Sequence, residues 1–290
     1  MKKITLEAYA KINLYLDVTS KRSDGYHNIE SVMQTVSLSD TVTVSIDENA
    51  DSKSIIQHFS NSDLPCDETN LCYKAAVAYF KHYGFENYAV EISVEKRIPE
   101  AAGLAGGSAD AAAVIRALAL LCENNSSDEK LCEIGLAVGS DVPFCIIGGT
   151  CAVTGRGESV TKLEPLTGVY AVISKSANES VSTKEAYARI DSNCSNSMPS
   201  IPFDAYINAV CSGDTVNIAE GAYNIFQNVM SDTLVDTYKI IDTLKQSGAL
   251  CSLMSGSGPS VFGIFETKKL AEKACEDLKK SYFAAFCELK

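Results

Sequence analysis

The stretch GLAGGSADAAA, residues 103–113, combines glycines, a serine and an alanine-rich run in an order that suits the binding of an anion. Glycines allow positive φ angles and let a ligand approach the backbone closely. Amide groups at the start of a helix attract negative charge, because they have no partner inside the helix. The stretch by itself leaves two interpretations open: a phosphate site, or a plain tight turn before a capped helix.

Two common phosphate-binding motifs are excluded for this stretch. No Gly-Lys-Ser/Thr follows the glycines, and their spacing is not GxGxxG. A second glycine-rich turn, SGSGPS at residues 255–260, lies between two strand-like runs and is equally consistent with a tight hairpin. Two such turns in one chain favour a phosphate site, because each supplies exposed backbone donors.

Three side chains elsewhere could take part in proton or charge chemistry, but each also has an ordinary explanation. Lys11 stands at the start of a strand-like run, where a lysine is commonly a solvated charge. Asp141 precedes Val-Pro, where a carboxylate commonly forms a turn or a cap. His27 follows an Asp-Gly turn, and a lone histidine is more often structural than catalytic. Taken singly, these residues do not indicate a reaction.

The composition is that of a globular protein large enough for one big domain or two of ordinary size. The 290 residues are 46% hydrophobic and 21% charged. A formal net charge of −12 argues against nucleic acid or an anionic membrane as the main partner, but not against a small anionic ligand. The 11 cysteines have no CxxC spacing, and no apolar stretch is long enough to span a membrane. We therefore expect a cytoplasmic protein with reduced thiols.

Periodicity in the first half predicts strands, then a helix, then the glycine-rich stretch. Strands are expected at 4–6, 12–16, 31–37, 41–46 and 88–94, and a solvated hairpin at 47–63. A helix is expected from Leu71, with Thr69 or Asn70 as its cap and Gly84 at its end. Further helices are expected over residues 108–122 and 128–138.

The second half predicts a comparable mixture of helices and strands. Strands are expected at 150–154, 169–173, 250–254, 260–266 and 283–289, and helices at 183–190, 203–211, 214–222, 231–247 and 267–281. This pattern predicts the α+β class, with two domains at 1–160 and 161–290.

Considered together, the motifs resemble those of the GHMP kinases, the family of galactokinase, homoserine kinase and mevalonate kinase. PEAAGLAGGSADAAA is similar to the central phosphate-binding motif, LMSGSGPSVFG to the third motif and AYAKINLYLDV to the first, in the family order. The resemblance implies an α+β fold of two domains. The N-terminal one would be like domain 2 of ribosomal protein S5, with a left-handed βαβ crossover, and the C-terminal one ferredoxin-like. It also implies a kinase that uses ATP and Mg²⁺.

Within the family, the runs AKINLYLDVTSKRSDGYHNIESVMQTVSLSD and GSDVPFCIIGGTCAVTGRGE are similar to one branch. That branch phosphorylates the 2-hydroxyl of a cytidine diphosphate-linked methylerythritol in the non-mevalonate route to isoprenoids. Two alternatives stay open: a kinase of another alcohol, such as homoserine, and a nucleotide-binding homologue without catalysis. The Gly-Tyr-His run weighs against the first, and the intact Lys11 and Asp141 weigh against the second. A homodimer is also left open.

The resemblance implies a role for each matching position on the side of the alcohol substrate. Lys11 and Asp141 match the catalytic pair: Asp141 would accept the hydroxyl proton or orient the alcohol, and Lys11 would stabilise the developing alkoxide. The positions that match substrate-binding residues are Asn13, Tyr26, His27, Thr183 and Tyr187. Of these residues, the two tyrosines would stack on the cytosine, and His27 would form a hydrogen bond with the polar edge of the base.

The resemblance likewise implies how ATP is bound. Asn70 and Leu71 match residues near the adenine, and the phosphate loop matches Pro99, Glu100, Ala101, Ala102, Gly103, Leu104, Ala105, Gly106, Gly107, Ser108 and Ala109. No metal ligand is assigned, because Mg²⁺ bound to ATP keeps several waters; Ser108 is the one contributor considered. The loop departs from many relatives at Ala101 and Ala102, where they carry more glycine. Asp110, in the first turn of the helix, is expected to point sideways from a phosphate.

Overall fold

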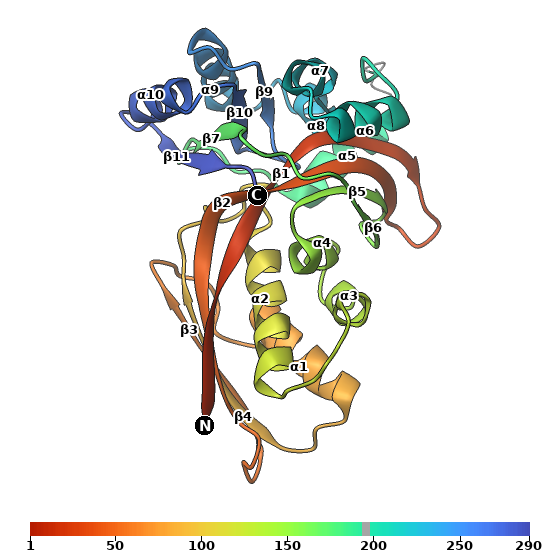
Figure 1. The fold of residues 1–290 in the computed structure, drawn as a ribbon, viewed down its shortest axis with the longest axis vertical. Helices are drawn as coiled ribbons and strands as arrows, with labels where there is room; N and C mark the ends of the chain where they lie inside the picture. The colour runs from red at the N-terminus through yellow and green to blue at the C-terminus, as the bar shows by residue number, and fades with distance from the viewer. Residues whose placement is uncertain (193–197) are drawn as a thin grey trace. The chain divides into compact units, whose positions relative to one another are not determined.

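The computed structural model describes residues 1–192 and 198–290, which divide into two compact units. Unit 1 contains residues 1–10, 39–98 and 105–147, and unit 2 contains residues 11–38, 99–104 and 148–290. Two long strands, β1 (Lys2–Lys21) and β2 (His27–Asp47), contribute residues to both units (Figure 1). The predicted Asp-Gly turn joins them, with Gly25 at a φ of 86°.

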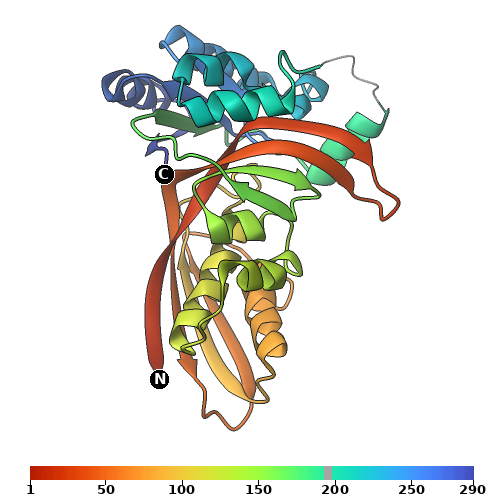
Figure 2. The same ribbon diagram turned by 45° about the vertical axis from the view of Figure 1, so that its right-hand side comes forward.

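Unit 1 is a sheet with its helices on one face (Figure 2). Its further elements are β3 (Lys53–Ser60), α1 (Leu71–Tyr83), β4 (Tyr88–Glu95), α2 (Gly106–Leu121), α3 (Asp128–Leu136) and α4 (Val142–Ile147). The predicted limits of α1 are confirmed: the Asn70 side chain accepts from the backbone N–H of Cys72, and Gly84 ends the helix at a φ of 72°. The alanines of α2 are buried against this sheet and α1, because small side chains allow close packing.

The prediction of a solvated hairpin at residues 47–63 was wrong. Residues Lys53–Ser60 form β3, which pairs in parallel with β4, so that β3, α1 and β4 make a βαβ unit. The strand lies at the edge of the sheet, and most of its side chains are exposed or half-buried. Its apolar alternation is therefore weak. Its partner comes only after α1, so the neighbouring sequence contains no sign of the pairing.

Unit 2 contains the part of the long hairpin nearest its turn, residues 11–38, and a separate antiparallel sheet. β5 (Thr150–Gly155) pairs with β2 and with β6 (Ser159–Lys162), and β8 (Tyr223–Asn224) pairs with β1. The separate sheet has the order β11-β7-β10-β9, formed by β7 (Tyr170–Lys175), β9 (Cys251–Met254), β10 (Val261–Phe265) and β11 (Phe283–Glu288).

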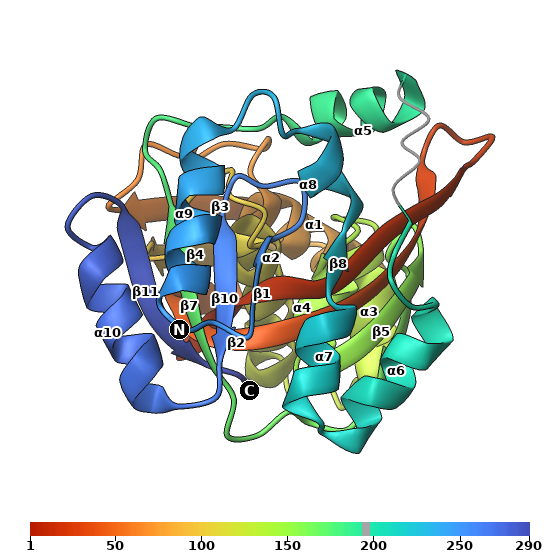
Figure 3. The same ribbon diagram turned by 90° about the horizontal axis from the view of Figure 1, so that it is seen from above.

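The helices of unit 2 follow the predicted order, with short additions. They are α5 (Thr183–Ser192), α6 (Phe203–Ser212), α7 (Thr215–Gly221), α8 (Ile225–Val229), α9 (Val235–Gln246) and α10 (Lys268–Leu278). α9 and α10 pack on the separate sheet, as Figure 3 shows, which is the ferredoxin-like arrangement that the resemblance implies. Sequence analysis missed α4, β6, β8 and α8, because segments this short have little periodicity. In the described part of the chain, no helix combines the length and apolarity needed to cross a membrane.

A buried ion cluster holds the segment that precedes the glycine-rich stretch. Lys96 directly follows β4, and its Nζ donates to Asp110 Oδ2 at 2.6 Å and also to Asp40 Oδ2. The other oxygen of Asp40 accepts from the backbone N–H of Ile98 at 2.8 Å and from that of Arg97. Asp110 therefore points into unit 1, where its side chain is 2% exposed.

Burial, and after it the neighbouring charges of the cluster, perturb the carboxyl group of Asp110. Burial is the largest cause that raises the pKa of Asp110 from 3.8 to about 7; the Lys96 charge opposes this shift and the Asp40 charge adds to it. Asp110 Oδ1 has no hydrogen-bond partner among the described residues. Near neutral pH, Asp110 thus takes up a proton more readily in the folded chain than in the unfolded one.

We expect the Asp110 carboxyl group to make the free energy of unfolding depend on pH. Because the folded pKa is raised, its stabilising contribution is complete below about pH 4 and is lost as the pH rises through about 7. Asp110→Asn should remove a slope of up to about 1.4 kcal/mol per pH unit in that window. Urea unfolding between pH 4 and 8 measures it. The exposed Asp128→Asn is the control, and an unchanged slope in Asp110→Asn would contradict the shift.

Candidate functional site

Lys11 is buried, so the interpretation of this lysine as a solvated surface charge is wrong. Its residue is 3% exposed, and Nζ donates to Asn13 Oδ1 at 2.6 Å and to the carbonyl oxygen of Gly103 at 2.9 Å. Lys11 and Asn13 alternate along β1, which places them on the same face of the strand. A buried ammonium group needs such partners, because removal of a charge from water costs much more than removal of a neutral group.

A chain of hydrogen bonds sets the orientation of the Asn13 amide. Asn13 Nδ2 donates to Ser31 Oγ at 2.9 Å, and Ser31 Oγ donates to the carbonyl oxygen of Tyr15 at 2.7 Å. Since the amide nitrogen is engaged by Ser31, the oxygen Oδ1 faces Lys11. Sequence analysis missed Ser31; its position on β2, which neighbours β1 in the sheet, is visible only once the strands are paired.

The two glycine-rich turns lie against each other within unit 2. Ser255 Oγ donates to the carbonyl oxygen of Gly103 at 3.0 Å, and the Ser260 N–H donates to that of Ala102 at 3.3 Å. A Cβ atom at Gly103 would overlap the carbonyl oxygen of Ser255, and one at Gly256 would lie 3.2 Å from Lys11 Nζ. The glycines are thus required by the close approach of the turns as well as by positive φ angles.

Two further side chains hold the second turn in place. Asn224 Nδ2 donates to the carbonyl oxygens of Met254 at 2.6 Å and Gly256 at 2.9 Å, while Asn224 Oδ1 caps α8. Thr183, the first residue of α5, forms a 3.2 Å hydrogen bond with Ser257 Oγ. The structure therefore joins one predicted substrate residue to the second glycine-rich turn. Asn224 was missed; an asparagine before a helix was the signal that could have shown it.

The helix that begins at Gly106 in unit 1 has no side-chain cap. Its N-cap residue is Ala105, in the left-handed conformation at a φ of 57°, and no side chain accepts from its first amide groups. Ser108 lies inside the first turn and is half-buried, whereas Gly107 is exposed. A Cβ atom at Gly107 would lie 3.5 Å from Leu71 Cδ1, so a predicted adenine residue is next to the predicted phosphate loop.

The two alanines at positions 101 and 102 of the loop differ in conformation and exposure. Ala101 adopts a φ of 47°, a conformation that glycine accepts more readily, while Ala102 is buried at 3% exposure.

Two other residues predicted to bind ATP have structural contacts of their own. Asn70 is the N-cap of α1, and its Nδ2 donates to the carbonyl oxygen of Pro65 at 3.0 Å. Pro99 and Glu100 begin the loop, and the Glu100 carbonyl oxygen accepts from Lys175 Nζ at 3.2 Å.

Asp141 directly precedes α4 in unit 1. Its backbone carbonyl accepts from the Cys145 N–H at 3.1 Å, and the residue is half-buried. Asp141 and Lys11 belong to different units, so their pairing stays a prediction. Among the described residues, no group of three or more His, Cys, Asp and Glu side chains could hold a metal ion.

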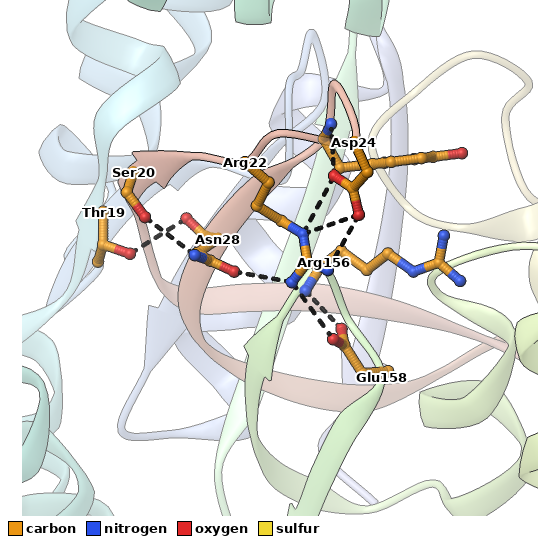
Figure 4. A network of polar contacts seen from close by, with 8 residues as sticks. Thr19, Ser20, Arg22, Asp24, Asn28, Arg156 and Glu158 are labelled. Atoms are coloured by element: carbon orange, nitrogen blue, oxygen red, sulfur yellow. Dashed lines mark hydrogen bonds and ion pairs between the residues drawn. The ribbon is translucent and has the colours of Figure 1, made fainter.

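A network of charged side chains holds the turn between β1 and β2 (Figure 4), and Tyr26 lies on this turn. Arg22 binds the carboxylate of Asp24, and Asp24 Oδ1 accepts from the Tyr26 N–H at 3.1 Å. Arg22 also lies 3.6 Å from Glu158, in the turn between β5 and β6. The guanidinium group of Arg156 stands 5.0 Å from the centre of the Tyr26 ring. The exposed ring is therefore presented from an ordered turn.

His27 and Tyr187 are brought into direct contact. Their rings stack with centroids 4.7 Å apart, and Phe226 lies edge-on against Tyr187 at 4.9 Å. His27 Nε2 lies 2.8 Å from Asp191 Oδ1 at the end of α5, a residue that sequence analysis missed. The predicted base-binding residues His27 and Tyr187 thus form one aromatic cluster, with Tyr26 adjacent to it in the chain.

Comparisons with known proteins agree with these motifs. Residues 70–149 match the N-terminal domain of GHMP kinases, and residues 207–284 match their C-terminal domain. The chain is 42% identical to the 4-diphosphocytidyl-2-C-methyl-D-erythritol kinase of Caldicellulosiruptor bescii, over 94% of this chain and 93% of that protein. It is 39% identical to the enzyme of the same name from Clostridium botulinum, over 98% of both chains.

Solved structures show the same similarity. A crystal structure of 4-(cytidine 5'-diphospho)-2C-methyl-D-erythritol kinase has a TM-score of 0.80 at 29% identity and covers 99% of both chains. A homoserine kinase from Cytophaga hutchinsonii has a TM-score of 0.77 at 21% identity and covers 99% of this chain and 95% of that one. At 21% identity, the similarity to the homoserine kinase shows only that the two folds are alike.

The contact between the glycine-rich turns can be tested with a pair of alanine substitutions. Gly25→Ala adds only the strain of a positive φ, about 1–2 kcal/mol, because no described atom lies within 4 Å of the added Cβ. Gly103→Ala adds that strain and the overlap with Ser255, a further 1–3 kcal/mol or so. Urea unfolding should therefore show a larger loss for Gly103→Ala. Equal losses would contradict the close approach.

Proposed function

The chain belongs to the GHMP kinases, among the 4-diphosphocytidyl-2-C-methyl-D-erythritol kinases, and from this membership we propose how its residues carry the reaction. The enzyme transfers a phosphoryl group from ATP to the 2-hydroxyl of 4-diphosphocytidyl-2-C-methyl-D-erythritol. One observation carries the assignment of the site. The carbonyl oxygen of Gly103, in the central family motif, accepts hydrogen bonds from Lys11 of the first motif and from Ser255 of the third.

We propose that Lys11 and Asp141 act on the hydroxyl group of the substrate. Lys11 has a fixed ammonium group, since Asn13 and Gly103 hold it, and a fixed charge can stabilise the developing alkoxide without reorganisation. Asp141 would accept the hydroxyl proton or orient the alcohol. Phosphoryl transfer asks little covalent chemistry of the protein, so positioning and charge account for most of the rate.

The start of α2 fits the phosphates of ATP. Its first amide groups have no side-chain cap, and the helix dipole favours negative charge there. ATP supplies the phosphoryl group, and Mg²⁺ offsets its charge. We propose that phosphate oxygens and waters provide most of the metal ligands, with Ser108 as the one hydroxyl of the loop close enough in sequence to contribute. Asn70 and Leu71 would contact the adenine beside Gly107.

The cytidine end would bind at the aromatic cluster of unit 2. Tyr26 and Tyr187 offer ring faces for stacking on the base, which contributes about 1–3 kcal/mol per contact in single-stranded nucleic acid sites. Stacking does not distinguish bases, so we assign base identity to the hydrogen bonds of His27. Thr183 and Asn13 would line the rest of the substrate.

We also propose the domain limits and the location of the enzyme. The two family domains would span residues 1–160 and 161–290. The enzyme would work in the cytoplasm, in keeping with its ten described free thiols.

The activity is tested by ADP release from the purified protein. We expect release with 4-diphosphocytidyl-2-C-methyl-D-erythritol and little with homoserine, mevalonate or galactose. Asp141→Asn should lower the turnover number by two or more orders of magnitude, roughly the share of a general base, while ATP still binds. A wild-type rate in that variant would exclude the role of Asp141. Preference for homoserine would instead overturn the substrate.

The stacking role of Tyr26 is tested separately. Tyr26→Ala should raise KM for the cytidylyl substrate by about tenfold or more, since one stacking contact is lost, and leave KM for ATP nearly unchanged. Tyr26→Phe keeps the ring and should behave like the wild type. Equal increases in both KM values in Tyr26→Ala would show that the residue acts on the fold rather than on the base.

A further inference from the structure

Asp191 lies at the end of α5 and holds the ring of His27. Its Oδ1 is 2.8 Å from His27 Nε2, and its Oδ2 is 2.6 Å from Lys21 Nζ. The hydrogen bond from Lys21, followed by that from His27, lowers the pKa of Asp191. An ionised carboxylate can only accept hydrogen bonds, so the proton between Asp191 and His27 belongs to Nε2.

This contact determines what the other nitrogen of His27 can do. A neutral imidazole carries one N–H, and the partner of one nitrogen decides which tautomer is present. With Nε2 protonated toward Asp191, Nδ1 has a lone pair and is an acceptor. The ring is also held in its plane, because it stacks on Tyr187 and its side chain is 8% exposed.

α5 supplies both constraints from one face. Tyr187 and Asp191 are four residues apart, which places them on the same side of the helix. Tyr187 orients the ring plane of His27, and Asp191 determines which ring nitrogen carries the proton. The Gly-Tyr-His turn and α5 therefore form a prearranged unit, in which both the plane of the His27 ring and the partner of its Nε2 are set.

We propose that Asp191 is a positioning residue that fixes the Nε2–H tautomer of His27, so that Nδ1 selects a cytosine amino group over a uracil carbonyl oxygen. The proposal rests on the proposed function, which brings a cytidine to this cluster. Cytosine presents an N–H₂ donor at its position 4, where uracil, like thymine, presents an oxygen acceptor. An acceptor at Nδ1 can accept a hydrogen bond from the cytosine amino group. Opposite the uracil oxygen, two acceptors would face each other and both would stay unpaired, which costs binding free energy.

The test compares Asp191→Asn with Glu185→Gln, a change of another carboxylate on the same helix, where Glu185 pairs with Arg189. Asparagine has the shape of aspartate but can donate, which permits the Nδ1–H tautomer of His27. We expect the ratio of Kd for UDP to Kd for CDP, and the ratio of kcat/KM for the cytidylyl substrate to that for its uridylyl analogue, to fall by about tenfold in Asp191→Asn. Glu185→Gln should keep the ratios, and KM for ATP should be unchanged in both variants.

Nitrogen-15 NMR of the His27 ring in the full-length wild-type chain reads the tautomer directly. Protonated Nε2 in the wild type, lost or diminished in Asp191→Asn, supports the proposal. Protonated Nδ1 in the wild type, or unchanged ratios in Asp191→Asn, overturns it. A failure of the proposed function is distinguishable, because the wild type would then phosphorylate no cytidylyl substrate, while the NMR spectrum would still report on the contact between Asp191 and His27.

Discussion

A lysine ammonium group out of contact with water is the constraint on which the site depends. Lys11 is 3% exposed, and it donates to Asn13 and to the carbonyl oxygen of Gly103. An unpaired charge in this position would cost several kcal/mol, so the surrounding groups are arranged to accept from it. Gly103 also accepts from Ser255, which means that one carbonyl oxygen connects β1, the first glycine-rich turn and the second.

The glycines follow from this arrangement. Backbone atoms of the two turns approach so closely that a Cβ atom at Gly103 would overlap Ser255, and one at Gly256 would crowd Lys11. The same residues therefore serve a packing role within unit 2. The amide groups that suit a phosphate belong to the start of α2, after these glycines, where Ala105 takes a positive φ without being glycine. Along its length, the motif thus consists first of closely packed glycines and then of uncapped helix amides.

Local signals in the sequence predicted most elements, and tertiary contacts account for what they missed. Asn70 and Gly84 mark the ends of α1 through their own side chain and φ angle, so these limits could be predicted. β3 could not, because its pairing with β4 is distant in the chain and its exposed edge has little pattern. The site shows the same division: the motifs indicated Lys11 and His27, while Ser31, Asn224 and Asp191 act on neighbours that only the fold brings close.

The electrostatics of the phosphate loop explain how an acidic chain can present a site for ATP. The formal net charge is −12, and Asp110 is the fifth residue of α2, close enough to the helix start for an outward-facing carboxylate to oppose a phosphate there. The fold directs Asp110 inward to Lys96 and raises its pKa to about 7, which reduces the negative charge at this position. The helix dipole and uncapped amides then dominate locally. In the proposed function, the Lys96 cluster would therefore do more than link strand and helix, because it would reduce the negative charge that opposes a phosphate at the start of α2.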